Sequence, residues 1–262
     1  MNGEVFQISK IVLTTRLALQ GNIDFSFSLS QYDNKIVFRF LNKKTILGNR
    51  EVIECTPEKW YKKIVANGLK YIYLLINASV KDSYLRGFAN TWPICMATFY
   101  KNGHVTYWTP MWEFDSKQKM WNIEYTEHEW SDPPKELPRF DDPSDDYGNV
   151  LCQIEKLANV IGCEGFGKIF HDAYEILVRE DNVEIPEWMG DVKNILSGKN
   201  LRLFLAASKA DVFGGMGSWN DDPSGMAHEK GMLEEYERLS AELLVQNERA
   251  IMYAVNVTNC KP

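Results

Sequence analysis

Residues 94–126 read ICMATFYKNGHVTYWTPMWEFDSKQKMWNIEYT, and this stretch decides how the first half of the chain folds. Asn102-Gly103 is the strongest short signal for a β-hairpin, because both residues accept the positive φ angles of a two-residue turn. The segments on either side, Ile94 to Tyr100 and Val105 to Phe114, are rich in aromatic and β-branched residues. A third such segment runs from Met120 to Thr126, so we predict an antiparallel meander.

Further elements are predicted before this meander. Residues 23–29 and 36–40 alternate apolar and polar side chains, which is typical of half-buried strands. Thr56 offers an N-cap and is followed by proline, and Gly68 suits a helix C-terminus, so a helix is expected between them. The apolar run 71–76 then predicts a central strand.

The second half of the chain has helical periodicity. It follows an acidic, proline-rich segment at residues 131–148, in which no regular element is expected. Apolar residues then recur every three or four positions. Helices are predicted there, including one at 187–196, one at 201–212 and a final, longest helix from Met232 onward.

These patterns predict an α+β fold. A β-rich lobe with one helix spans residues 1–130, an acidic and proline-rich connector spans 131–148, and an α-helical lobe spans 149–262. The apolar faces of both lobes need cover. We therefore expect the antiparallel β-rich half to pack against the helical half as one compact unit.

Charged residues are distributed unequally between the two halves of the chain. Residues 1–130 contain 16 Lys and Arg against 12 Asp and Glu, whereas residues 131–262 contain 13 against 24. An acidic half repels the phosphates of nucleic acids and attracts basic partners over several ångströms. We therefore expect no nucleic acid among the partners, although a solvated acidic surface without a partner would have the same composition.

Several features favour a cytoplasmic protein. The longest apolar runs fall far short of the roughly 20 residues that a membrane helix needs. The N-terminus lacks the basic and apolar regions of a signal peptide, so we expect no membrane partner. An odd number of cysteines without a Cys-x-x-Cys pair favours reduced and mostly buried thiols. They are Cys55, Cys95, Cys152, Cys163 and Cys260.

The sequence contains no recognisable catalytic pattern. The four histidines are far apart and none has a zinc-ligand spacing, so we expect no metal and no cofactor. Glu127-His128-Glu129 could pair a carboxylate with an imidazole, but neighbouring strand residues point to opposite faces, and a solvated strand end is the simpler interpretation. Ser218 and Cys163 have no assigned activating base, and we assign no catalytic residue.

Residues 213–222 read FGGMGSWNDD and interrupt two helical stretches. We expect a structural loop held by a buried Trp219. Residues 220–222 should help to cap the next helix. Glycine accepts positive φ freely, so a left-handed backbone is expected at one of Gly214, Gly215 or Gly217.

Aromatic residues are dense between 92 and 130 and fall on both parities of the predicted meander, so they cannot all face one core. Those left over either pack beneath helices or form a binding surface in which Trp and Tyr act as anchors. Trp108 and Trp112 are our candidate anchors. The full set is Trp92, Phe99, Tyr100, Tyr107, Trp108, Trp112, Phe114, Trp121, Tyr125 and Trp130.

Three segments near the C-terminus carry a family resemblance. They are LAASKADVFGGMGSWND at 205–221, EYERLS at 235–240 and AVN at 254–256. This region, about the last fifth of the chain, resembles the C-terminal region of uncharacterised bacterial proteins associated with immunity genes of polymorphic toxin systems. The resemblance implies a cytoplasmic protein that binds one cognate toxin, and it brings no catalytic residues.

We therefore expect an immunity protein that neutralises a cognate toxin by direct contact, and its acidic surface favours a basic toxin. Its partner-binding candidates are Asp141, Asp142, Asp145, Asp146, Asp221, Asp222, Glu234, Glu235, Trp108 and Trp112. Two alternatives stay open. The first is a small-substrate hydrolase that uses the loop 213–222, with contributions from Ser218, Asp221, Asp222 or His228. The second is a structural module of a larger assembly.

Overall fold

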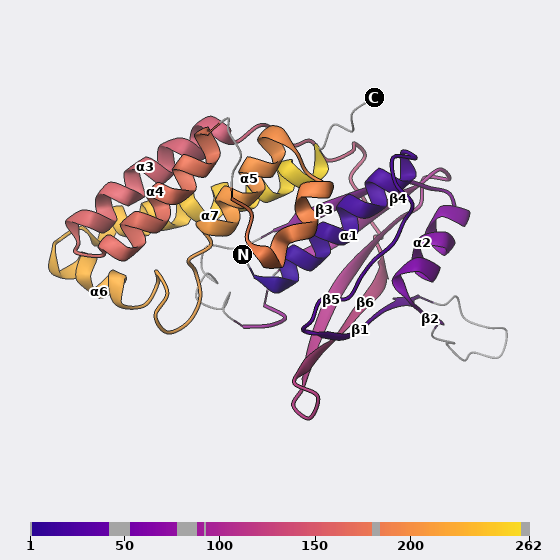
Figure 1. Ribbon diagram of the computed structural model, residues 1–262. Coiled ribbons are helices and arrows are strands. Elements are labelled where there is room, and N and C mark those ends of the chain that lie inside the picture. The colour runs from indigo at the N-terminus through magenta and orange to yellow at the C-terminus, as the bar shows by residue number, and fades with distance from the viewer. Residues whose placement is uncertain (1, 42–52, 78–87, 92, 180–183, 258–262) are drawn as a thin grey trace. The chain divides into compact units, whose positions relative to one another are not determined.

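The fold is α+β, as predicted from the sequence. Strands lie in the first half of the chain, and helices lie mostly in the second half (Figure 1). The chain divides into two compact units, which we call the sheet unit and the helical unit. The packing of one half against the other stays a prediction. The computed structural model describes residues 2–41, 53–77, 88–91, 93–179 and 184–257.

The two units interleave along the sequence. The helical unit comprises Met1–Phe6, Ile76–Pro93 and Arg139–Asn259, and the sheet unit comprises Gln7–Leu75, Ile94–Pro138 and Cys260–Pro262. The last boundary, between Pro138 and Arg139, falls within the predicted connector. The sequence prediction divides the chain near residue 130. It does not predict that Met1–Phe6 and Ile76–Pro93 belong to the same unit as the later helices.

Most of the helical unit is built from the second half of the chain. Its helices there are α3 (Ser144–Val160), α4 (Glu164–Val178), the 3-10 helix η2 (Glu187–Asn194), α5 (Gly198–Lys209), α6 (Asp222–Glu229) and α7 (Leu233–Asn256). The final helix is the longest, as predicted, with 24 residues. However, α3 begins inside the acidic connector, because carboxylates in a first turn favour a helix N-terminus.

The sheet unit contains a mixed sheet. Its strands are β1 (Asp33–Phe40), β2 (Ile53–Cys55), β3 (Leu69–Ile76), β4 (Ile94–Tyr100), β5 (Val105–Asp115) and β6 (Met120–Glu129), with only Ile76 assigned to the helical unit. The order is β2-β1-β6-β5-β4-β3, so β3 lies at one end and is not central. The predicted meander is confirmed, because β5 pairs antiparallel with β4 and β6, and Gly103 has a φ of +82°. β1 runs parallel to β6, which makes the sheet mixed and not purely antiparallel.

The N-terminal segment differs from the sequence prediction. Residues 23–29 form no strand, and helix α1 (Gly3–Leu19) precedes them. The buried residues of α1 do not form one stripe, because consecutive residues such as Ile11, Val12 and Leu13 are all buried. A helix surrounded on nearly every side lacks the one-sided apolar stripe by which amphipathic helices are recognised.

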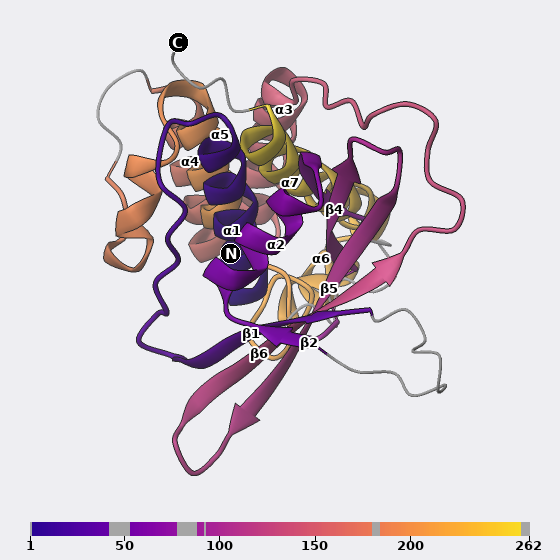
Figure 2. The same ribbon diagram turned by 90° about the vertical axis from the view of Figure 1, so that its right-hand side faces the viewer.

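Helix α2 (Pro57–Ala66) confirms the predicted helix between a threonine cap and a glycine. Thr56 Oγ1 accepts a hydrogen bond from Lys59 N at 3.5 Å, and Gly68 has a φ of +88°. α2 connects β2 and β3, which are the two ends of the strand order. The helix therefore crosses one face of the sheet (Figure 2).

Aromatic residues form the core under α2. Trp60 of α2 stacks on Phe38 of β1 with ring centroids 4.2 Å apart, and it meets Trp108 of β5 edge to face at 5.7 Å. Tyr125 of β6 stacks on Phe38 at 5.0 Å, and its hydroxyl donates to Gln7 Oε1 of α1 at 2.9 Å. Two helices of the N-terminal half thus cover this face.

A buried carboxylate lies near the end of β6. Glu127 is 9 % exposed and accepts hydrogen bonds from Leu41 N at 3.1 Å and from Thr106 Oγ1 at 3.2 Å. Burial raises the pKa of Glu127, while these hydrogen bonds and the nearby charges of His104 and Lys63 oppose the rise. The predicted solvated strand end is therefore wrong at this residue.

Replacing Glu127 with glutamine is expected to change how stability depends on pH. A folded-state pKa above the unfolded value contributes stability at low pH, and this contribution is lost as pH rises through the folded pKa. The variant stays neutral, so its melting temperature minus that of the wild type should increase from about pH 4 to about pH 8. Circular dichroism melts measure the difference. Glu129→Gln, an exposed change on the same strand, should give a nearly constant difference. A constant difference for Glu127→Gln as well would contradict the prediction.

The described cysteines are free thiols, as expected. They are Cys55, Cys95, Cys152 and Cys163, of which only Cys163 is buried, so the expectation of mostly buried thiols is wrong. Cys260 and Trp92 lie outside the described residues. Within the described ranges, every helix is too short or too polar to cross a lipid bilayer.

Candidate protein-binding surface

The glycine loop, Phe213–Asp222, is anchored by a buried tryptophan. Trp219 is fully buried, as predicted. Its Nε1 donates to Ser240 Oγ of α7 at 2.7 Å, and its backbone oxygen accepts from the Tyr236 hydroxyl at 2.5 Å. The rings around it, at centroid distances of 5.3, 5.1 and 5.2 Å, are those of Phe166, Phe170 and Tyr236. The tryptophan therefore ties the loop to α4 and α7.

Hydrogen bonds within the loop fix its backbone. Gly214 N donates to Asn220 Oδ1 at 3.1 Å, and Gly217 N donates to Asp221 Oδ2 at 2.7 Å. The hydroxyl of Ser218 donates to Gly214 O at 2.9 Å. Two amides that could form an oxyanion hole are thus already bonded, which does not favour the hydrolase alternative. Gly217 is the left-handed glycine, with a φ of +79°.

The predicted capping of α6 by one of residues 220–222 is confirmed in position, but no side chain in the described part of the chain makes the capping hydrogen bond. Asp221 occupies the N-cap position of α6, but its carboxylate makes no hydrogen bond to the first amides of the helix. The carboxylate accepts from Gly217 N instead. The Asp221 carboxylate therefore stabilises the loop, whereas its backbone oxygen accepts from Ser224 N at 3.3 Å at the start of the helix.

This fixed loop exposes an apolar side chain. Met216 lies between two glycines and is 99 % exposed. Methionine is enriched at protein interfaces, because its flexible thioether adapts to irregular surfaces. A fixed loop also loses little backbone entropy when a partner binds. Met216 is therefore a candidate anchor for a protein partner.

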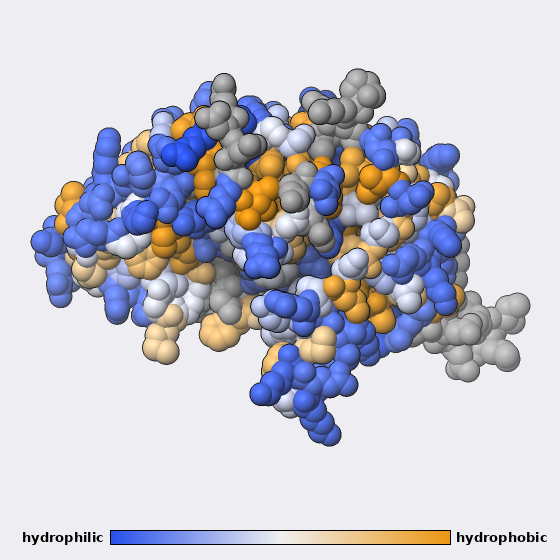
Figure 3. All heavy atoms as spheres, viewed as in Figure 1, coloured by the Kyte–Doolittle hydropathy of each residue, from blue (hydrophilic) through white to orange (hydrophobic). Residues whose placement is uncertain are grey.

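Exposed carboxylates lie close to the glycine loop. Cys163 Sγ is 3.4 Å from Met226 Sδ, so the start of α4 lies against α6. Trp219 of the loop packs on Tyr236, so the start of α7 lies against the loop. Among the described residues, these carboxylates form no ion pair; they are Glu164, Asp221, Asp222, Glu234, Glu235 and Glu237. We call Met216 and these carboxylates the acidic loop surface. Hydrophilic side chains predominate at this end of the helical unit, which carries α3, α4 and α6 (Figure 3).

The other predicted acidic residues lie elsewhere in the helical unit. They are Asp141, Asp142, Asp145 and Asp146. They lie at the start of α3, a helix of 17 residues that is about 25 Å long. The other end of α3 leads to α4. The length of α3 therefore separates these four residues from the start of α4. Asp142 pairs with Lys199, and Asp146 Oδ2 lies 3.2 Å from Arg249 Nη1. Burial alone would raise the pKa of Asp142, but hydrogen bonds from Lys199 and Ser144 lower it. Two of the four thus hold α3 to α5 and α7.

The two predicted aromatic anchors are buried in the sheet unit. Trp108 has no exposed surface, because α2 covers it, so its role as a surface anchor is wrong. Trp112 is 9 % exposed, and its ring meets that of Trp121 at 5.8 Å. On the other face of the sheet, Tyr107 stacks on His128 at 4.9 Å. The aromatic residues of the meander thus pack on both faces of the sheet.

The candidate nucleophiles and bases do not come together. Burial and the neighbouring charge of Glu164 raise the pKa of the Cys163 thiol, which disfavours a reactive thiolate. His128 bonds to Thr109 Oγ1 at 2.8 Å, and burial lowers its pKa. Within the described ranges, Ser218 bonds only inside its own loop and His228 makes no hydrogen bond to it. In the same part of the chain, no group of three or more His, Cys, Asp or Glu side chains could hold a metal ion.

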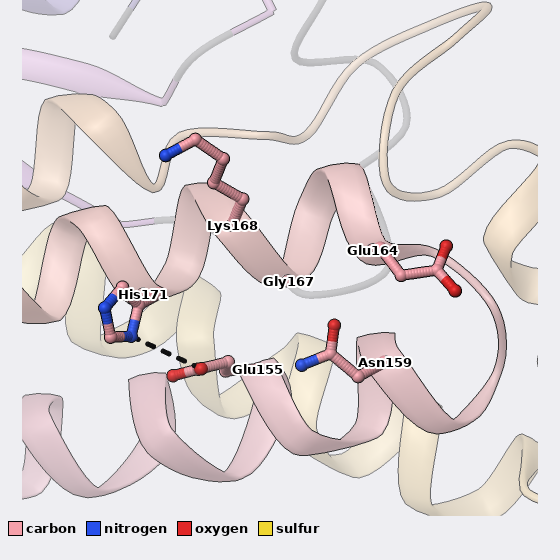
Figure 4. Close-up of a pocket in the computed structure, with 6 residues that line it drawn as sticks. All are labelled: Glu155, Asn159, Glu164, Gly167, Lys168 and His171. Carbon is pink, nitrogen blue, oxygen red and sulfur yellow. Dashed lines mark ion pairs between the residues drawn. The ribbon is translucent and has the colours of Figure 1, made fainter.

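A groove of about 320 Å³ runs between α3 and α4 beside this surface (Figure 4). Glu155 and Asn159 line it one helical turn apart on α3. From α4 it is lined by residues spaced along one helix face, namely Glu164, Gly167, Lys168 and His171. A Cβ added to Gly167 would lie 2.4 Å from Asn159 Oδ1, so the glycine allows the amide to lie against α4.

The roles of Met216, Glu164 and this groove were not predicted from the sequence. Signals were present, because Met216 stands between glycines and Glu164, Gly167 and His171 recur at the spacing of one helix face. Exposure and the absence of an ion pair cannot be derived from spacing alone. Comparison of the chain with protein-family models, curated proteins and solved structures finds no match.

Proposed function

We propose that this chain is an immunity protein, which acts in the bacterial cytoplasm and neutralises a cognate protein toxin by direct contact. The observation that carries the proposal is the acidic loop surface, in which an apolar side chain stands on a fixed loop among unpaired carboxylates. Apolar side chains within a polar, charged rim are typical of protein interfaces. The resemblance of residues 205–221 to proteins of toxin systems supports the same function.

The chemistry of the surface favours a partner with a basic face. Exposed carboxylates attract such a face over about 8 Å at physiological ionic strength and so accelerate encounter. After docking, burial of the Met216 side chain contributes about 1.5 to 3 kcal/mol and slows dissociation. The toxin is neutralised because its active or entry surface is covered, and the immunity protein needs no catalytic group.

Co-purification tests the proposal directly. The partner to use is the C-terminal domain of a large secreted protein encoded directly upstream, co-expressed with the tagged full-length chain. We expect one complex in size-exclusion chromatography and protection of growth when the toxin domain is produced. Separate elution together with unprotected growth would overturn the proposal.

Neutralising the acidic loop surface is expected to slow association. Glu234→Gln with Glu235→Gln should reduce the association rate about threefold or more at low salt and leave dissociation nearly unchanged, because these charges act mainly before contact. Surface plasmon resonance across a salt series measures both rates.

The matched control is Asp141→Asn with Asp145→Asn, which removes the same charge from the far end of α3. It should change the association rate much less. An association rate that responds neither to salt nor to the change at Glu234 and Glu235 would rule out steering by these carboxylates.

A further inference from the structure

The groove between α3 and α4 has an unusual charge distribution. Lys168 Nζ lies 3.2 Å from Asp172 Oδ1, so its charge is compensated outside the groove lining. In Figure 4 the Lys168 ammonium points away from the space between the helices. Glu155 is paired with His171, Oε1 to Nδ1 at 3.3 Å, and this partner is charged only when protonated. The groove is therefore acidic, although a lysine and a histidine line it.

The shape of the groove matches this charge. Figure 4 shows Glu155 toward one end, Glu164 at the other, and the amide of Asn159 between them. The Asn159 amide lies directly against Gly167, where a Cβ would approach its Oδ1 to 2.4 Å. The result is a narrow volume of about 320 Å³ with carboxylate and amide oxygens along its length. An arginine side chain suits such a site, because its planar guanidinium offers five N–H donors and no acceptor.

We infer that this groove receives an arginine side chain of the partner, and this inference rests on the proposed function. The groove shares Glu164 with the acidic loop surface, so a partner docked on Met216 can reach both. The arginine side chain lies in the groove between α3 and α4, and its guanidinium bonds to Glu164 or Glu155. The groove provides specificity for one side chain, whereas the surrounding carboxylates provide general attraction.

A small-molecule titration tests the groove without the toxin. The probe is N-acetyl-arginine amide, and N-acetyl-citrulline amide is its neutral isostere. We expect the arginine probe to shift the NMR signals of the Gly167 backbone amide and the Asn159 side-chain amide, and the citrulline probe to shift them much less. Equal shifts with both probes, or no shifts, would overturn the inference.

Two glycine variants separate the shape of the groove from its charge. Gly167→Ala forces Asn159 to move into the groove and should weaken arginine-probe binding about fivefold or more, because the site loses volume while its charge is unchanged. Gly165→Ala is the matched control on the same helix, since a Cβ there meets no atom within 4 Å. Equal affinities of the two variants for the arginine probe would contradict the inference.

The same pair of variants distinguishes failure of the inference from failure of the proposed function. If the toxin binds wild type and the Gly167→Ala variant equally well, the groove receives no partner side chain and the inference is wrong, while the immunity function stands. If no toxin domain binds but the arginine probe shifts Gly167 specifically, the proposed function fails and the groove remains a guanidinium site.

Discussion

Replacing Trp219 with alanine is expected to lower the free energy of unfolding by about 3 to 5 kcal/mol, the usual effect of removing a buried aromatic side chain. The indole is fully buried and lies 5.1 Å from Phe170 and 5.2 Å from Tyr236. Alanine would leave a cavity between α4 and α7 and remove the donor to Ser240 Oγ. Urea denaturation followed by far-ultraviolet circular dichroism measures the change.

Trp219→Phe separates the two contributions of this side chain. Phenylalanine keeps most of the ring volume and loses the Nε1 donor, so it should destabilise less than alanine. Met216→Ala, in the same loop, should leave the denaturation midpoint unchanged, because the methionine is exposed. An unchanged midpoint for Trp219→Ala would show that the ring does not anchor the loop.

The parts of the fold that could be predicted are those whose signal is local. The hairpin at Asn102-Gly103 and the helix that starts after Thr56 depend on turn and cap chemistry within a few residues. The order of the strands is not local. The parallel pairing of β1 with β6 joins residues such as Phe38 and Tyr125, which are far apart in the sequence. No pattern within either strand specifies this partner.

The two errors near the N-terminus have a common cause. Alternation at residues 23–29 shows that a strand could bury one face, but it does not supply a neighbouring strand. In α1, Ile11 and Leu13 are buried together with Thr15, so position on the helix does not separate apolar from polar residues. Both the unpaired segment and the enclosed helix depend on tertiary surroundings, which periodicity does not contain.

The candidate surface was predictable in composition but not in arrangement. Loop chemistry correctly indicated a buried Trp219 and a left-handed glycine, which the structure places at Gly217. The acidic candidates looked equivalent in sequence. The structure pairs Asp142 with Lys199 and Asp146 with Arg249, and it leaves those near the glycine loop unpaired. Only the folded chain distinguishes a carboxylate that holds helices together from one that is available to a partner.

Replacing Met216 with alanine is expected to weaken toxin binding by about tenfold to a hundredfold, because burying a methionine side chain is worth about 1.5 to 3 kcal/mol and each 1.4 kcal/mol is a factor of ten. The effect should appear in the dissociation rate, since the side chain contributes after contact and not during approach. Surface plasmon resonance at one fixed salt concentration measures it.

Val178→Ala provides the matched control for this variant. Val178 is 48 % exposed and ends α4, at the opposite end of the helix from Glu164. Both substitutions remove an exposed apolar side chain, so a general loss of surface apolarity would affect them equally. A dissociation rate that rises only for Met216→Ala places the contact at the glycine loop. Equal rates for both variants and wild type would contradict Met216 as an anchor, because truncation of an anchor side chain raises the dissociation rate.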